Sequence, residues 1–143
     1  MSAEENKAQV RRAHEAISAG DLDAFVQFLA PDVVDHSLPP GFPAGAEGSR
    51  QFIAMLRGAF PDFQVTADDV IAEGDKVVAR VTAHGTHRGE FMGIPATGKQ
   101  ATWSTMEIVR IVNGKTVERW AESDALGLMQ QLGLIPAPGQ PGS

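Results

Sequence analysis

The chain has 143 residues, a net charge of −6 and no cysteine. This length suits one domain with its own hydrophobic core, and the lack of cysteine excludes a disulfide scaffold and thiol catalysis. The acidic balance and the scattered basic residues argue against nucleic acid or an anionic membrane as a partner. The N-terminus is polar, and no apolar stretch approaches the ~20 residues of a transmembrane helix. We therefore expect a cytoplasmic protein.

The first part of the chain has helical spacing. Residues 4–18 carry apolar side chains on one face, and Gly20 is suited to end that helix. Asp21 predicts the start of a second helix, which extends through Ala30 and ends at Pro31. A short strand at 32–36 comes next, then a proline-rich loop at 37–46 that we expect to border a site, and then a third helix at 47–59.

From residue 63 the apolar period changes to two. The alternation predicts strands at 63–72, 76–86, 99–112 and 116–123, and Asn113-Gly114 predicts a tight hairpin between the last two. We expect a final short helix at 124–132 and a flexible C-terminal tail at 136–143 (PAPGQPGS). Helices followed by a long antiparallel meander indicate an α+β fold in a single domain that spans residues 1–135.

Short segments spread along nearly the whole chain carry a family resemblance. They lie at 20–24, 31–36, 60–63, 74–80 (GDKVVAR), 85–89, 93–98 (GIPATG), 112–115, 119–120 and 130–133. Through them the chain resembles the SnoaL-like polyketide cyclase (ester cyclase) family of the NTF2-like superfamily. The resemblance implies a cone in which N-terminal helices pack on a curved, mostly antiparallel sheet around a pocket for a small hydrophobic molecule.

The same resemblance implies acid–base chemistry on a polyketide-like carbonyl substrate, without a metal or cofactor. Aldol-type cyclisation, isomerisation and a related lyase step are the reactions it suggests. Ring-closing members are similar in using an Asp on the last strand, a His on the preceding strand and a Gln two residues before that His. Those positions correspond to Ala121, Glu107 and Thr105 in this chain, so the family's constellation is not intact.

Glu107 is the first candidate for catalysis. With period two it shares a strand face with Trp103, Thr105 and Val109. A carboxyl group among apolar side chains is unusual, and burial is expected to raise its pKa and make it a general acid or base. The alternative is that Glu107 faces solvent, while Met106 and Ile108 face the core.

His36 is the second candidate, because it ends a strand beside the proline-rich loop. Steroid isomerases of the same fold have a proton-transferring carboxylate at what looks like this position, and a histidine can transfer protons at neutral pH. A histidine that bonds a loop carbonyl is the alternative.

Substrate-binding roles are expected for Arg80, His87, Trp103, Thr105, Ala121 and Asp124. Arg80 could instead be solvated on the outer strand face, and Asp124 could cap the last helix. The four histidines show no spacing typical of a metal site.

Three functional hypotheses follow. In the first, an ester cyclase-type enzyme uses His36 or Glu107 to move the proton, while the other group or Arg80 stabilises the enolate oxygen. In the second, the same pocket belongs to a non-catalytic binding domain, which the alanine at position 121 favours. In the third, an epoxide hydrolase would use an Asp-Arg-Asp arrangement, for which no Asp-x-Arg or Arg-x-Asp strand pair is present. Apolar residues on both faces of two strands also predict a homodimer through the outer sheet face.

Overall fold

The computed structural model describes residues 2–136 and residue 139, so the expected tail at 136–143 lies largely outside the described residues. The elements are, in chain order, α1 (Ala3–Ala19), α2 (Leu22–Gln27), β1 (Leu29–Asp35), α3 (Ala46–Ala59), β2 (Gln64–Glu73), β3 (Lys76–Thr86), β4 (Gln100–Val112), β5 (Lys115–Ser123) and α4 (Ala125–Gln131). None of the described helices is long and apolar enough to cross a membrane.

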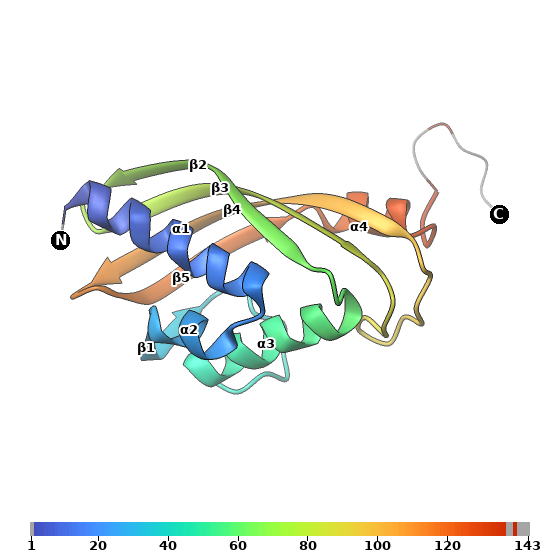
Figure 1. Ribbon diagram of the computed structural model, residues 1–143, viewed down its shortest axis with the longest axis horizontal. Coiled ribbons are helices and arrows are strands. Elements are labelled where there is room, and N and C mark those ends of the chain that lie inside the picture. The colour runs from blue at the N-terminus through green and yellow to red at the C-terminus, as the bar shows by residue number, and fades with distance from the viewer. Residues whose placement is uncertain (1, 137–138, 140–143) are drawn as a thin grey trace.

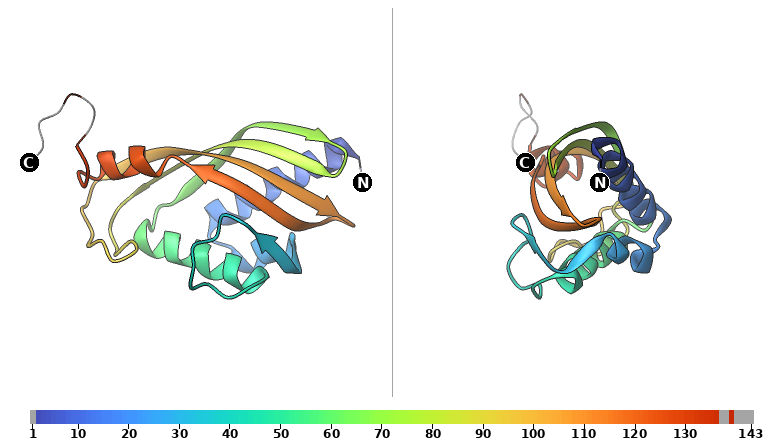
Figure 2. Two further views of the ribbon diagram at one scale, coloured as in Figure 1. Left: turned by 180° about the vertical axis from the view of Figure 1, so that it is seen from behind. Right: turned by 90° about the vertical axis from the view of Figure 1, so that its left-hand side faces the viewer.

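The strands form one mixed sheet in the order β1-β5-β4-β3-β2. β1 runs parallel to β5, and the other neighbours are antiparallel. The sheet curves, and α1 and α3 cover its concave side (Figures 1 and 2). The predicted α+β fold, with N-terminal helices packed on a curved, mostly antiparallel sheet, is confirmed. The sheet itself does not close into a barrel, because the edge strands β1 and β2 do not pair with each other, and helices complete the enclosure.

The boundary between α2 and β1 differs from the sequence-based expectation. α2 ends at Gln27, and β1 already begins at Leu29, although a helix through Ala30 was predicted. Leu29 pairs with Thr116 of β5, and the register shifts before Val34. Pro31 is therefore a strand residue. It is tolerated there because β1 is an edge strand, where a missing backbone donor need not break the ladder.

Alternation along β3 and β4 decides which side chains face the helices. On β3 the odd positions Val77, Ala79, Val81 and Ala83 are buried, whereas Arg80 and His84 are exposed. On β4 Trp103, Glu107 and Val109 are buried, whereas Met106 and Ile108 point outward. The expectation that Glu107 shares the inward face with Trp103 and Val109 is confirmed, and this places a carboxyl group inside the molecule.

Two glycines of α3 should respond oppositely to alanine. A Cβ on Gly48 would overlap the carbonyl oxygen of Pro43, where the proline-rich loop crosses the helix, whereas a Cβ on Gly58 meets nothing within 4 Å. Gly48→Ala should lower the free energy of unfolding by roughly 1–3 kcal/mol through overpacking. Gly58→Ala, the matched control, should raise it by about 0.5–1 kcal/mol through helix propensity. Urea denaturation checks both, and equal effects at the two sites would contradict the close packing of the loop.

Candidate active site

The helices and the concave face of the sheet enclose a cavity of about 600 Å³. Its wall is mostly apolar, and its aromatic part consists of Phe25, Phe28, Phe52, Phe63, Phe91 and Trp103. A cavity of this volume and lining is typical of sites for small hydrophobic ligands. The expectation of an internal pocket with residue 107 in its wall is confirmed.

Charged side chains meet at one part of this wall, around Glu107. Nε2 of His14 lies 2.9 Å from Oε1 of Glu107, and Nε of Arg119 donates a 2.7 Å hydrogen bond to Oε2. Nη1 of Arg119 also donates to Oδ2 of Asp35 and to Oγ of Ser37, both at 3.0 Å. The side chains of Glu107 and Asp35 are only 5% and 8% exposed. Arg119 thus bridges two buried carboxylates.

Four elements supply these groups, and the sheet register explains their meeting. Asp35, at the end of β1, is the direct register partner of Arg119 on β5. Arg119 in turn pairs with Val109 of β4, two residues from Glu107 on the same face. His14 comes from the side of α1 that packs toward the sheet and also carries Val10 and Ile17.

The hydrogen bonds of His14 define its charge. Nδ1 lies 2.8 Å from the carbonyl oxygen of Val10, and Nε2 faces a carboxylate oxygen. With Glu107 ionised, neither acceptor has a proton to give, so both ring nitrogens carry one and His14 is an imidazolium. Burial alone would lower the pKa of His14, but the hydrogen bond and charge of Glu107 outweigh burial and raise it.

The expected rise in the pKa of Glu107 is wrong. Burial does favour the neutral acid, but the charge of Arg119 and the hydrogen bond and charge of His14 outweigh it, and they lower the pKa to about 2. The carboxyl is therefore ionised at neutral pH. Desolvation was the only effect that could be read from the strand pattern, since the two cations arrive from α1 and β5.

His36 lines the cavity but is not the partner of Glu107. Its Nε2 lies 2.7 Å from Oε2 of Glu118, its ring stacks on Trp120 at 5.1 Å, and its side chain is 44% exposed. His36 therefore sits at the rim of the cavity. The histidine that contacts Glu107 is His14.

The other expected site residues divide into two groups. Trp103, Thr105 and Ala121 line the cavity, and Thr105 also shares a hydrogen bond with Ser123. Three others lie outside its described wall, namely Arg80, His87 and Asp124.

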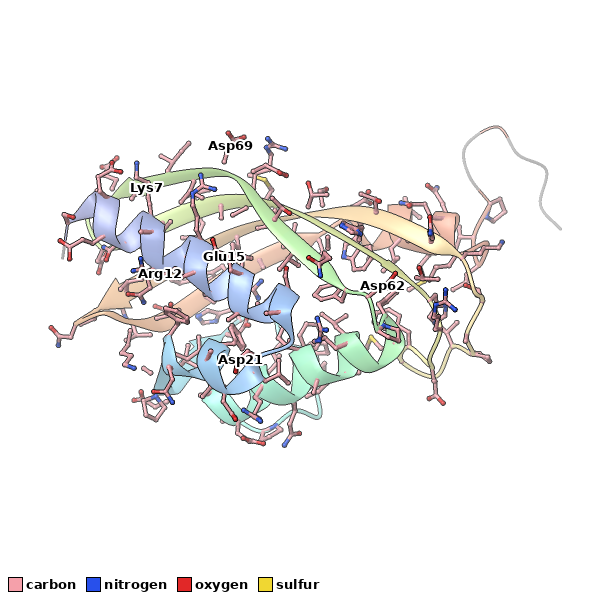
Figure 3. All side chains as sticks on the ribbon, in the orientation of Figure 1. Lys7, Arg12, Glu15, Asp21, Asp62 and Asp69 are labelled. Atoms are coloured by element: carbon pink, nitrogen blue, oxygen red, sulfur yellow. The ribbon has the colours of Figure 1, made fainter. Side chains whose placement is uncertain are left out.

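Each of these three has another partner. Arg80 is on the outer face, where it pairs with Asp69, which projects away from the molecule in Figure 3. His87 is fully buried against Phe60, with Nδ1 bonded to Thr97. Asp124 caps α4 by accepting from the backbone N–H of Gly127.

Sequence reasoning did not assign His14, Arg119 or Asp35 to the site. Arg119 could have been found, because it lies two residues before Ala121 and so shares its strand face. His14 lies at helical spacing with Val10 and Ile17, but nothing local indicates a carboxylate opposite it. Among the described residues, no three His, Asp or Glu side chains are grouped as a metal site would require.

The pair of His14 and Glu107 should make stability depend on pH in both directions. The pKa of Glu107 falls from 4.5 to about 2, a contribution of about 3 kcal/mol that is full above pH 4.5 and lost as pH falls toward 2. The pKa of His14 is raised above 6.5, so its contribution is full below pH 6.5 and lost as pH rises through the folded value. The pair should therefore stabilise most between pH 4.5 and 6.5.

Urea denaturation of the wild type and Glu107→Gln measures this contribution. The difference in unfolding free energy should peak near about pH 5.5 and shrink near about pH 3 and pH 9. Glu73→Gln, at an exposed position, is the matched control and should show no such profile. A difference that does not shrink as the pH rises above 6.5 would mean that His14 and Glu107 are not coupled.

Comparison with known proteins identifies the family. Residues 8–132 match the model of the SnoaL-like polyketide cyclase family. Aklanonic acid methyl ester cyclase DnrD of Streptomyces peucetius is 30% identical over 131 residues, which cover 87% of this chain and 88% of the relative. The structure of TsrD from Streptomyces laurentii has a TM-score of 0.87 at 31% identity and covers 94% and 99% of the two chains. The structure of AclR from Streptomyces galilaeus has a TM-score of 0.84 at 32% identity, and the match covers 95% of this chain and 85% of AclR. This chain therefore belongs to the SnoaL-like polyketide cyclase family.

Proposed function

We propose that this protein is an ester cyclase-type enzyme that closes a ring in a small hydrophobic polyketide-like substrate by intramolecular aldol chemistry. The observation that carries the proposal is the buried pair of His14 and Glu107 in the wall of an apolar cavity. A non-catalytic binding domain needs only the apolar wall. An imidazolium bonded to a carboxylate in a desolvated site can also donate one proton and accept another.

The proposed reaction uses both groups in one cycle. Glu107 accepts a proton from the substrate carbon that lies between two carbonyl groups, which leaves an enolate. The enolate carbon attacks a ketone carbon of the same molecule, so a carbon–carbon bond forms and the ketone C=O π bond breaks. Nε2 of His14 gives its proton to the resulting alkoxide. Glu107 then returns its proton to His14 across their 2.9 Å contact, and the resting state is restored.

The low pKa of Glu107 makes it a weak base, so proton abstraction from the substrate costs free energy. Transfer of a proton from the substrate carbon costs about 1.4 kcal/mol for each unit by which the pKa of that carbon exceeds the pKa of Glu107, which is about 2. The enolate must therefore be stabilised as it forms. Arg119 supports the step, because its guanidinium lies in the cavity wall, where a cation stabilises an enolate oxygen.

Epoxide hydrolysis is a second candidate, favoured by one specific observation. Arg119 bridges the carboxylates of Glu107 and Asp35, which is the acid–Arg–acid arrangement that adjacent strand residues did not supply. The Asp35 carboxylate would accept a proton from the attacking water, and the imidazolium of His14 would give its proton to the epoxide oxygen as the C–O bond breaks. The two candidates differ in which residue they require, since Asp35 is not part of the aldol cycle.

Substitution of the acid–base pair tests the proposal. Aklanonic acid methyl ester, the substrate named for a relative, is the first compound to assay. Glu107→Gln and His14→Gln should each lower kcat by roughly 10²–10⁴-fold, because each removes one proton-transfer group. The double variant should lose less than the product of the two losses, since the groups act as a unit.

His84→Gln, an exposed histidine on β3, is the matched control and should keep full activity. Retained activity in both single variants would contradict the proposed pair. The epoxide hydrolase would be favoured if the wild type hydrolysed cyclohexene oxide but cyclised no polyketide, and if Asp35→Asn abolished that hydrolysis. Tight binding of polyketides without any turnover would favour the binding domain.

We also propose that two copies associate through the outer sheet face. A row of apolar side chains crosses four strands in direct register, namely Ile71, Val78, Ile108 and Trp120. Ile71 is 67% exposed and Ile108 is 38% exposed. Charged groups of both signs, Arg80 and Glu118 among them, lie beside the row, so the face can complement a second copy of itself.

Light scattering at micromolar concentration should give twice the chain mass of 15.2 kDa. Ile108→Glu should give the monomer mass, because it places a charge in the apolar row. Leu126→Glu, the control, changes an apolar residue on α4 that is 58% exposed, more than Ile108, and it should leave the dimer intact. A monomer mass for the wild type would contradict the proposed dimer.

The remaining expectations accompany this function. We propose that the enzyme acts in the cytoplasm, without a cofactor and without nucleic acid as a partner. The absence of cysteine supports a cytoplasmic location, and the net charge of −6 argues against nucleic acid as a partner.

A further inference from the structure

The connection between β3 and β4 contains a tight turn at residues 91–94 that borders the cavity. The backbone N–H groups of Phe91 and Ile94 each donate to the other residue's carbonyl oxygen, at 2.9 and 2.8 Å. The two central residues both have positive φ, +48° for Met92 and +84° for Gly93. This is the requirement of a type I′ turn, whose first central position favours asparagine, aspartate or glycine.

Methionine is therefore unfavourable at position 92, where the backbone has a positive φ. A non-glycine residue without a short polar side chain costs roughly 1–2 kcal/mol in the left-handed region. The same chain shows the favourable solution elsewhere, because the β4–β5 hairpin has Asn113 at φ +51° followed by Gly114 at +76°. Asn113 and Met92 are the only described non-glycine residues with positive φ. Backbone strain of this kind is tolerated where the side chain has a task.

The surroundings of the turn hold Met92 in place over the cavity. Phe91, its neighbour, is buried and packs edge-on against Phe60 at 5.7 Å. The backbone N–H groups of Arg88 and Gly89 both donate to the carbonyl oxygen of Ala59, at the end of α3. Figure 2 shows this connection near the end of α3, at the same end of the molecule as α4. These contacts hold the β3–β4 connection against the C-terminal end of α3.

Met92 itself lies where the cavity opens. Its side chain belongs to the cavity wall and is 57% exposed, which identifies a position at the mouth. β4 begins near this connection, and Glu107 follows seven residues after Gln100, at roughly 3.4 Å per residue. Met92 and the charged cluster therefore lie toward different ends of the cavity. An unbranched, polarizable thioether chain adapts to apolar ligands of varied shape.

We propose that Met92 is a specificity-determining residue, whose side chain covers the apolar part of a bound substrate while the carbonyl part lies at Glu107. The inference rests on the proposed function, in that it needs a hydrophobic ligand in the cavity, but it does not depend on which reaction occurs. The strained turn is the observation that carries it, because the backbone would be more stable with the residue that stands at position 113.

An exchange of residues between the two turns tests the proposal, with 1-aminoanthracene as a neutral fluorescent probe for the cavity. Met92→Asn should raise Tm by roughly 3–6 °C, since asparagine suits the turn, and should weaken probe binding about three- to tenfold through the lost apolar contact. Asn113→Met, the matched control far from the cavity, should lower Tm and leave the Kd unchanged. Met92→Leu keeps the apolar contact and should bind like the wild type.

The outcomes separate this inference from the proposed reaction. If Met92→Asn binds the probe as tightly as the wild type, Met92 is no ligand contact and the inference is wrong. If the wild type binds no probe, the shared premise of a hydrophobic ligand fails, and both proposals fall. If Met92→Asn is more stable and binds more weakly while the wild type shows no cyclase activity, the inference holds and only the reaction is refuted.

Discussion

The ionised carboxyl group of Glu107 inside an apolar sheet face is the constraint on which the rest of the structure depends. A buried charge without partners would cost several kcal/mol, so cations must reach it. They come from two directions, His14 from α1 and Arg119 from β5. Arg119 in turn needs Asp35, which the parallel pairing of β1 with β5 delivers. One carboxylate thus links the helix to the sheet and the edge strand to its neighbour.

The ion pairs of Glu107 with His14 and Arg119 also limit the chemistry that the site can perform. Each cation that stabilises the carboxylate also makes it a weaker base, which is why the pKa of Glu107 falls to about 2 despite burial. The opposite holds for His14, because the hydrogen bond and charge of Glu107 raise its pKa despite burial. If a substrate oxygen attracted Arg119, the ion pair between Arg119 and Glu107 would weaken. Glu107 would then become a stronger base. In the proposed cycle, that guanidinium would couple substrate binding to proton abstraction.

The sequence predicted features that depend on local pattern. Period two along β4 placed Glu107, Trp103 and Thr105 on one face, and Asn113-Gly114 marked the hairpin that follows. The contact between His14 and Glu107 was missed, because the two residues are 93 positions apart and neither neighbourhood encodes the other. The sign of the pKa shift was wrong for the same reason, since desolvation is local whereas the compensating charges are not. Leu29 was assigned to a helix because its strand partner, Thr116, lies in β5.

The departures from the family pattern at positions 107 and 121 have one physical explanation. Glu107 and Ala121 are direct register partners on β4 and β5, and both face the cavity. An aspartate at 121 would place two carboxylates about 4.5–5.5 Å apart between their Cβ atoms, which is destabilising. A carboxylate on β4 therefore disfavours a second carboxylate at 121, and in this chain the histidine comes from another element. His14 on α1 meets that need, so the site keeps a histidine and a carboxylate while each stands on a different element.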